Sequence, residues 1–111
     1  MTLDNRLETI KRVIDENKGE DIEIFNLDKT DYMVSGVVIA TAMAEKHLDA
    51  LINFLKTDLK PEEDFLHVES SDEWVVADLG DILIHLMTKS AREKYHLETF
   101  LKEFEEKKSL S

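Results

Sequence analysis

The sequence contains no cysteine, one proline and three glycines. Without cysteine, the chain has no disulfide framework, no thiolate metal site and no cysteine nucleophile. Its longest run without a charged residue, Tyr32–Ala44, has about 13 residues, whereas a membrane-spanning helix needs about 20. The N-terminus carries Asp4 and Glu8 and no apolar stretch, so we expect neither a signal peptide nor a transit peptide.

Basic residues are also scarce. The chain has 14 Lys and Arg against 25 Asp and Glu, a formal net charge of −11 at pH 7. Because binding to nucleic acid depends largely on neutralising phosphates with basic side chains, we expect no direct nucleic-acid binding. A basic protein surface is the more favourable partner, with an attraction that salt weakens. The alternative is that the charge only keeps a small protein soluble.

The most informative stretch holds two apolar runs, Trp74–Ala77 and Ile82–Met87, separated by a short polar segment. Gly80 in that segment adopts a positive φ without strain, so the pattern predicts a β-hairpin. The second run is apolar on both alternating faces except at His85. It therefore predicts a central strand covered by helices on both sides.

Apolar spacing and turn residues predict the other elements. The predicted strands are Asp21–Leu27, Tyr32–Thr41 (with a bulge or bend at Ser35 and Gly36) and Phe65–Glu69. The predicted helices are one around Leu3–Ile14 and one at Met43–Lys60, which Pro61 ends. A last helix begins with a capping box at Ser90 and Glu93. Together they predict an α/β (α+β) fold with a mixed five-stranded sheet flanked by helices. At 111 residues we expect a single domain spanning residues 1–111, with residues 106–111 fraying.

Candidate chemical groups are few. The four histidines, none in a metal-binding spacing, are His47, His67, His85 and His96. His85 lies on the predicted central strand, where a core histidine is a better interpretation than a ligand. Asp78 and Asp81 flank the hairpin turn, and turn chemistry explains them better than a metal site does. We therefore expect no catalytic residue, no metal and no cofactor.

Trp74 is the only tryptophan. Two interpretations stay open: a core contact across the hairpin, or an exposed aromatic anchor for a partner protein. Acidic residues beside it, Glu69, Asp72 and Glu73, are consistent with the second.

The run from Trp74 to Met87, followed by Arg92–Glu98, resembles the signature of the ribosomal silencing factor family, also called Iojap-like. A looser resemblance covers residues from Glu20 through Val38–Thr41 to His47. The similarity extends over about residues 7–101. The sequence departs from the family pattern by extra residues around Val34–Val37, and by Ala42-Met43-Ala44 in place of a Gly-Thr-Ser turn.

This resemblance implies a nucleotidyltransferase-like fold that has lost its enzyme chemistry. It also implies a cytoplasmic translational repressor, which binds the large ribosomal subunit through large-subunit ribosomal protein fourteen and sterically blocks joining of the small subunit when nutrients are limited. A homodimer is implied as well. The alternatives from other classes are a residual nucleotide-binding enzyme and an acidic homodimeric scaffold for another basic protein.

For the ribosomal protein we expect the docking face to be the hairpin and its neighbours, because a tight hairpin presents side chains rigidly. Trp74 would be the aromatic anchor, and Tyr95 a flanking contact. The carboxylates that meet basic side chains would be Glu69, Asp78 and Asp81, with Leu79 in the turn.

Overall fold

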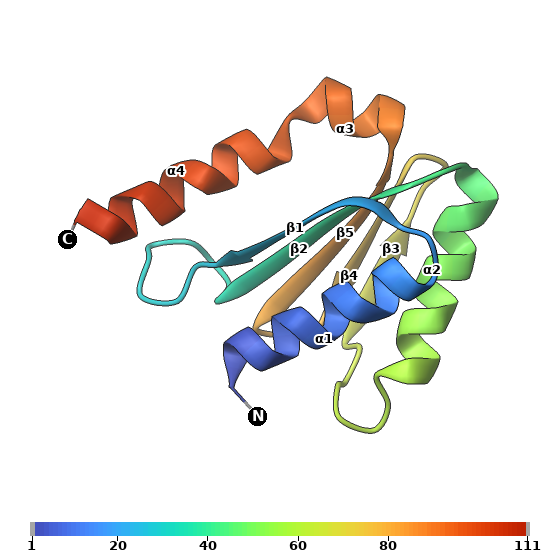
Figure 1. Cartoon of the computed structure of the whole chain (residues 1–111), viewed down its shortest axis with the longest axis horizontal. Coiled ribbons are helices and arrows are strands. Elements are labelled where there is room, and N and C mark those ends of the chain that lie inside the picture. The colour runs from blue at the N-terminus through green and yellow to red at the C-terminus, as the bar shows by residue number, and fades with distance from the viewer. Residues whose placement is uncertain (1, 111) are drawn as a thin grey trace.

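A computed structural model describes residues 2–110, with side chains for residues 2–106 (Figure 1). Its elements are α1 (Leu3–Glu16), β1 (Glu20–Asn26), β2 (Gly36–Ala42), α2 (Glu45–Asp58), β3 (His67–Ser70), β4 (Trp74–Asp78), β5 (Ile82–Thr88), α3 (Lys89–Tyr95) and α4 (Leu97–Leu110). The fraying of residues 106–111 stays a prediction, because residue 111 and the side chains of residues 107–110 lie outside the description.

The strands form one mixed five-stranded sheet in the order β1-β2-β5-β4-β3. β5 pairs with β2 in parallel and with β4 antiparallel, so it is the central strand that its two apolar faces predict. β4 and β5 form the predicted hairpin, and Gly80 in its turn has a φ of 95°. The expected α+β architecture is therefore confirmed.

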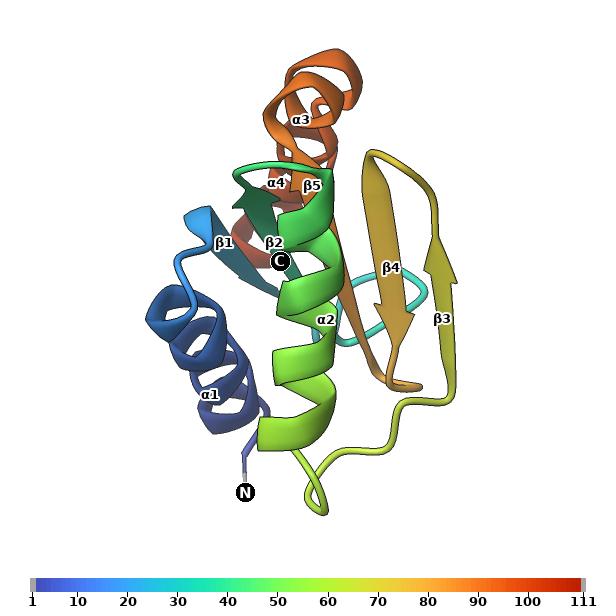
Figure 2. The ribbon, with the colours of Figure 1, turned by 90° about the vertical axis from the view of Figure 1, so that its right-hand side faces the viewer.

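Helices cover the two faces of the sheet unequally. α1 and α2 together pack on one face, against β1, β2, β4 and β5 (Figure 1 and Figure 2). α3 and α4 pack on the other face, against β1, β2 and β5. β5 contributes to both cores: Ile82, Ile84 and Leu86 to the first, and Met87 and Leu83 to the second.

The second strand is shorter than predicted. It begins at Gly36, and residues 32–35 belong to the preceding loop. The side chain of Tyr32 turns towards α4, where its ring lies 5.1 Å from that of Phe104. Gly36 lies against α1, because a Cβ atom there would stand 2.9 Å from Cδ2 of Leu7. The strand pattern of Tyr32–Ser35 was therefore misleading, since Tyr32 packs on a helix that is distant in sequence and Met33 is exposed.

The last helix also differs from its prediction. α3 begins at Lys89, and the hydroxyl of Thr88 accepts a hydrogen bond from the backbone N–H of Ala91. The cap is thus Thr88, and the capping box predicted at Ser90 is wrong. His96 then adopts a left-handed conformation (φ 48°) and separates α3 from α4. The predicted continuous helix is therefore two.

Arg6 joins three segments that are far apart in the sequence. Its guanidinium donates hydrogen bonds to both carboxylate oxygens of Glu63, at 2.9 and 2.7 Å, and to both of Asp81, at 2.6 and 2.9 Å. Glu63 is only 7% exposed. The bridge therefore holds α1, the segment after α2 and the β4–β5 turn in one arrangement.

We expect Arg6→Met to lower the free energy of unfolding by about 3 kcal/mol, because it leaves the buried carboxylate of Glu63 unpaired. Arg12→Met is the matched control, since Arg12 lies 3.9 Å from Glu16 with both side chains exposed. The control should cost less than about 0.5 kcal/mol. Urea unfolding measures both, and equal losses would contradict the role given to Arg6.

The same bridge predicts a dependence of stability on pH. Hydrogen bonds from Arg6 lower the pKa of Asp81, so the folded chain binds this proton less readily than the unfolded chain. Its contribution to stability is complete at neutral pH and is lost below about pH 4, as the pH falls through the lowered pKa. Asp81→Asn should lower stability at neutral pH and flatten the acid branch in thermal unfolding. Parallel curves for the two proteins would disprove this linkage.

Candidate docking face

Strand register places Glu69, Trp74 and Asp78 on one face of the sheet. Along β4, Val75 and Ala77 point into the core under α2, so Trp74, Val76 and Asp78 point to the opposite face. Glu69 on β3 lies directly across from Val76. The predicted carboxylates at positions 69 and 78 thus share a face with the predicted aromatic anchor.

α3 brings Tyr95 to the same face. The ring centroids of Tyr95 and Trp74 are 5.0 Å apart, with 42° between the planes, and the side chain of Tyr95 is 51% exposed. Trp74 also donates a hydrogen bond from Nε1 to Nδ1 of His85, at 3.0 Å. Trp74 is partly buried. It therefore has features of both a core contact and an exposed aromatic anchor.

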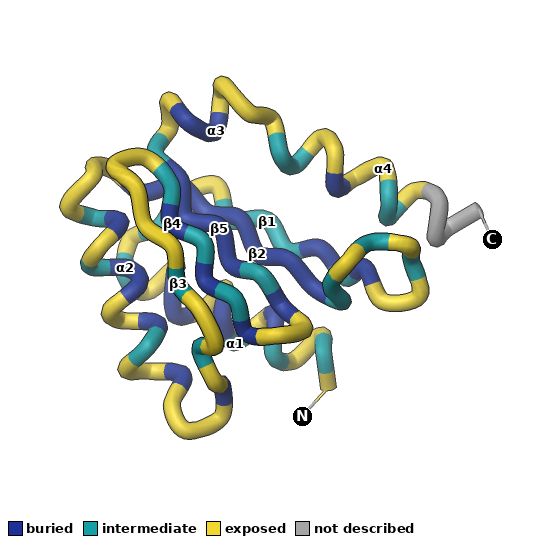
Figure 3. The backbone as a smooth tube through the Cα atoms, turned by 180° about the vertical axis from the view of Figure 1, so that it is seen from behind, coloured by how far each residue is buried: buried dark blue, intermediate teal, exposed yellow. Residues whose placement is uncertain are grey.

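No helix lies over β3 and β4 on this side in the part of the chain that the structure describes (Figure 3). We call the resulting surface the Trp74 face; its members are Glu69, Trp74, Val76, Asp78, Leu83 and Tyr95. Leu83 belongs to it because it pairs with Asp78 across the hairpin. A pocket of about 270 Å³ opens on it between Glu69, Ser70, Ser71, Trp74 and Val76. The Trp74 face therefore combines partly exposed apolar side chains with carboxylates.

Leu79 and Asp81 do not join this group. Leu79 is 7% exposed and packs in the core beneath α1 and α2. Asp81 is held by Arg6 on α1. Asp78 has a turn contact too, because one of its oxygens accepts the backbone N–H of Gly80 at 2.7 Å. Whether Leu79 and Asp81 touch a partner stays a prediction.

Sequence reasoning did not include Val76 and Leu83 in this surface, nor the buried His85 beneath it. The alternation along β4 was the available signal, because residues two apart on a strand share a face. Which face would be left uncovered depends on where α3 and α4 pack, and periodicity does not contain that information.

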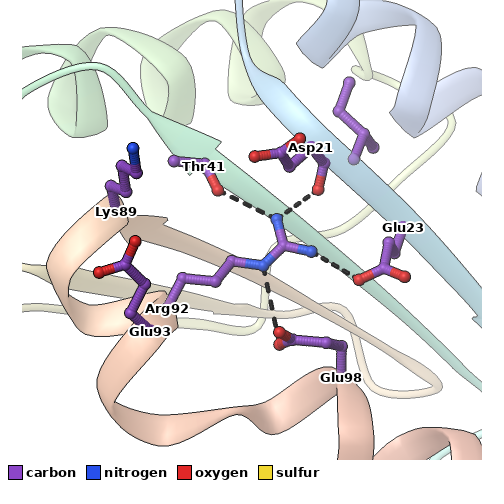
Figure 4. Close-up of a pocket in the computed structure, with 8 residues that line it drawn as sticks. Asp21, Glu23, Thr41, Lys89, Arg92, Glu93 and Glu98 are labelled. Atoms are coloured by element: carbon purple, nitrogen blue, oxygen red, sulfur yellow. Dashed lines mark hydrogen bonds and ion pairs between the residues drawn. The ribbon is translucent and has the colours of Figure 1, made fainter.

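A second cluster surrounds Arg92 at the ends of β2 and β5 (Figure 4). The guanidinium donates to the carbonyl of Asp21, to the hydroxyl of Thr41 at 3.0 Å and to Glu23 at 2.6 Å. Glu98 lies 3.7 Å from its Nε. A pocket of about 470 Å³ beside it is lined by Asp21, Ile22, Glu23, Thr41, Lys89, Arg92, Glu93 and Glu98.

A family model described as "Ribosomal silencing factor during starvation" matches residues 1–110 of the chain. The chain belongs to this family. The resemblance carried by Trp74–Met87 is thereby confirmed.

Individual relatives agree with the family match. The ribosomal silencing factor RsfS of Haemophilus influenzae is 30% identical over 95 residues, which cover 83% of this chain and 93% of the relative. The mouse protein named mitochondrial assembly of ribosomal large subunit protein 1 is 36% identical over 75 residues, 62% of this chain and 31% of the relative. A solved structure from Chromobacterium violaceum has a TM-score of 0.83 and 26% identity, covering 92% of this chain and 88% of that one.

Ribosomal silencing factors are regulatory proteins, not enzymes, so family membership assigns this chain a ribosome-related role in regulating translation and no reaction. Among the described residues, no three His, Asp or Glu side chains are grouped so that they could hold a metal ion. No described helix is both long and apolar enough to cross a bilayer.

The Arg92 pocket lies where many α/β folds bind nucleotides, outside the carboxyl ends of parallel strands. Its lining is unsuited to phosphate. Arg92 is already engaged by Glu23 and Thr41, and acidic side chains outnumber basic ones around it. The turn before α2 also has no hydroxyl group that could bind a phosphate. Ala44 caps the helix without a side-chain hydrogen bond, and the N–H of Met43 donates to Nδ1 of His47.

We therefore expect millimolar ATP with Mg²⁺ to leave the melting temperature of the protein unchanged. A ligand that binds only the native state must raise it. Differential scanning fluorimetry measures the shift, with Mg²⁺ alone and sodium sulfate at equal ionic strength as controls. A rise specific to the nucleotide would restore the nucleotide-binding alternative.

Proposed function

We propose that this chain is a translational repressor that binds the large ribosomal subunit through ribosomal protein fourteen. By occupying that surface, it sterically blocks joining of the small subunit and lowers translation when nutrients are limited. Such an action requires no catalysis. It places the protein in the cytoplasm, where the subunits meet.

The uncovered Trp74 face is the observation that carries this proposal. Protein interfaces are often anchored by a few aromatic side chains in a packed centre. Here Trp74 and Tyr95 are in contact, with partly exposed Val76 and Leu83 next to them on the sheet. We assign the anchoring role to these side chains, and we propose that Leu79 and Asp81 act indirectly by holding the hairpin turn.

Charge supports a basic protein partner. Glu69 and Asp78 lie on the face, and Asp72 and Glu73 precede Trp74 in the turn from β3. With a net charge of −11, the chain is repelled by ribosomal RNA and attracted to a basic ribosomal protein. The mouse relative is named for assembly of the ribosomal large subunit, which favours that subunit as the target.

We also propose a homodimer, as the family resemblance implies. Use of the same apolar face for self-association would make the dimer and the ribosome complex mutually exclusive.

The rival functions predict different results: a residual nucleotide-binding enzyme would be stabilised by nucleotide, and an acidic scaffold would show no preference for ribosomes over other basic proteins.

Co-sedimentation with separated large subunits, small subunits and assembled ribosomes tests the proposal. We expect binding to free large subunits only, weakening as salt is raised. Trp74→Ala should weaken this binding by about 2 kcal/mol, roughly thirtyfold, because it removes the central aromatic contact. Circular dichroism checks that the variant is folded.

Matched variants on the opposite side serve as controls. Phe54→Ala removes an aromatic side chain of α2 that is 46% exposed, and should leave binding unchanged.

Glu69→Lys should weaken binding and its salt dependence, whereas Glu8→Lys on α1, with the same change of charge, should have a smaller effect. Equal binding by Trp74→Ala and the parent chain would remove the Trp74 face from the interface, and absence of binding to large subunits would refute the proposed function.

A further inference from the structure

Beneath the Trp74 face, His85 is a buried polar side chain on the central strand. It is 7% exposed, and register places it between Val76 on β4 and Ile39 on β2. The rest of β5 from Ile82 to Met87 is apolar. A leucine or isoleucine would suit the packing of this position, so the presence of histidine calls for a physical reason.

The hydrogen bond from Trp74 determines the state of the imidazole. An indole N–H can only donate, so Nδ1 of His85 must be unprotonated to accept it. The neutral ring then carries its proton on Nε2, and that atom is buried without a hydrogen-bond partner among the described residues. Burial lowers the pKa of His85 to about 4, so the accepting form persists at neutral pH.

An unpaired buried donor is unfavourable for folding. The chain nevertheless retains it directly under the partly exposed aromatic residue of the docking face. Local features that weaken the fold concentrate at functional sites, where they serve the arrangement of another group.

We propose that His85 is a positioning residue that fixes the orientation of the Trp74 indole for partner binding. This inference rests on the proposed function. The indole contacts two rings, with His85 at a centroid distance of 5.7 Å and Tyr95 at 5.0 Å. The hydrogen bond fixes rotation of the indole, and the Tyr95 contact limits its tilt. An anchor held in this way loses little conformational entropy on binding.

Two substitutions separate the hydrogen bond from packing. His85→Leu fills the same space without an acceptor, whereas His85→Asn places a carbonyl oxygen where Nδ1 lies. We expect His85→Leu to remain folded and to bind large subunits about tenfold more weakly, as loss of one hydrogen bond would cause. His85→Asn should bind more tightly than His85→Leu. In a Trp74→Phe background, where the donor is absent, the same two substitutions should have no further effect.

The single tryptophan gives a direct readout that a packing role would not move. Its indole N–H resonance in a ¹H–¹⁵N spectrum should shift upfield and exchange faster with solvent in His85→Leu, and return towards the parent position in His85→Asn. If His85→Leu does not fold, Trp74→Phe alone removes the same hydrogen bond from the donor side and should weaken binding by at least the same factor.

The outcomes are distinct. If the parent chain binds large subunits and His85→Leu binds equally well, the positioning role is wrong although the proposed function stands. If His85→Leu and His85→Asn weaken binding equally, with the same loss in the Trp74→Phe background, His85 acts through packing and the inference is overturned. If the parent chain does not bind large subunits, the proposed function fails, and the inference about binding fails with it.

Discussion

β5 lies at the centre of the sheet with apolar side chains on both faces, and the rest of the structure depends on covering them. A strand buried on both sides requires helices above and below it. α1 and α2 cover one face from the first part of the chain, and α3, which begins directly after β5, starts the cover of the other. The two cores therefore share one strand.

The unequal cover has a functional consequence. α1 and α2 together pack against four strands, whereas α3 and α4 pack against β1, β2 and β5. Among the described residues, β3 and β4 thus have no helix over them on one side (Figure 3). Strand register places Trp74, Val76 and Glu69 on that side. This uncovered face, with apolar and acidic side chains, is the surface to which we assign the proposed docking.

Ion pairs stabilise the positions of the elements around this frame. Arg6 connects α1 to Glu63 and to Asp81 in the hairpin turn, and Arg92 connects α3 to β1, β2 and α4. Arg92 lies where many α/β folds hold a phosphate. The side chains around it are mainly carboxylates. The pocket beside Arg92 therefore lacks the positive charge that a phosphate site requires.

The sequence by itself determined the element order, the hairpin and the central position of β5, because apolar period and turn residues are local properties of the chain. It also identified the family, since Trp74–Met87 carries a specific motif. Only the tertiary structure decided that Asp81 faces Arg6 while Asp78 faces outwards, that Tyr32 packs on α4, and that His96 breaks the last helix. The contacts of Asp81 with Arg6 and of Tyr32 with α4 join residues tens of positions apart, and neither periodicity nor propensity encodes such contacts.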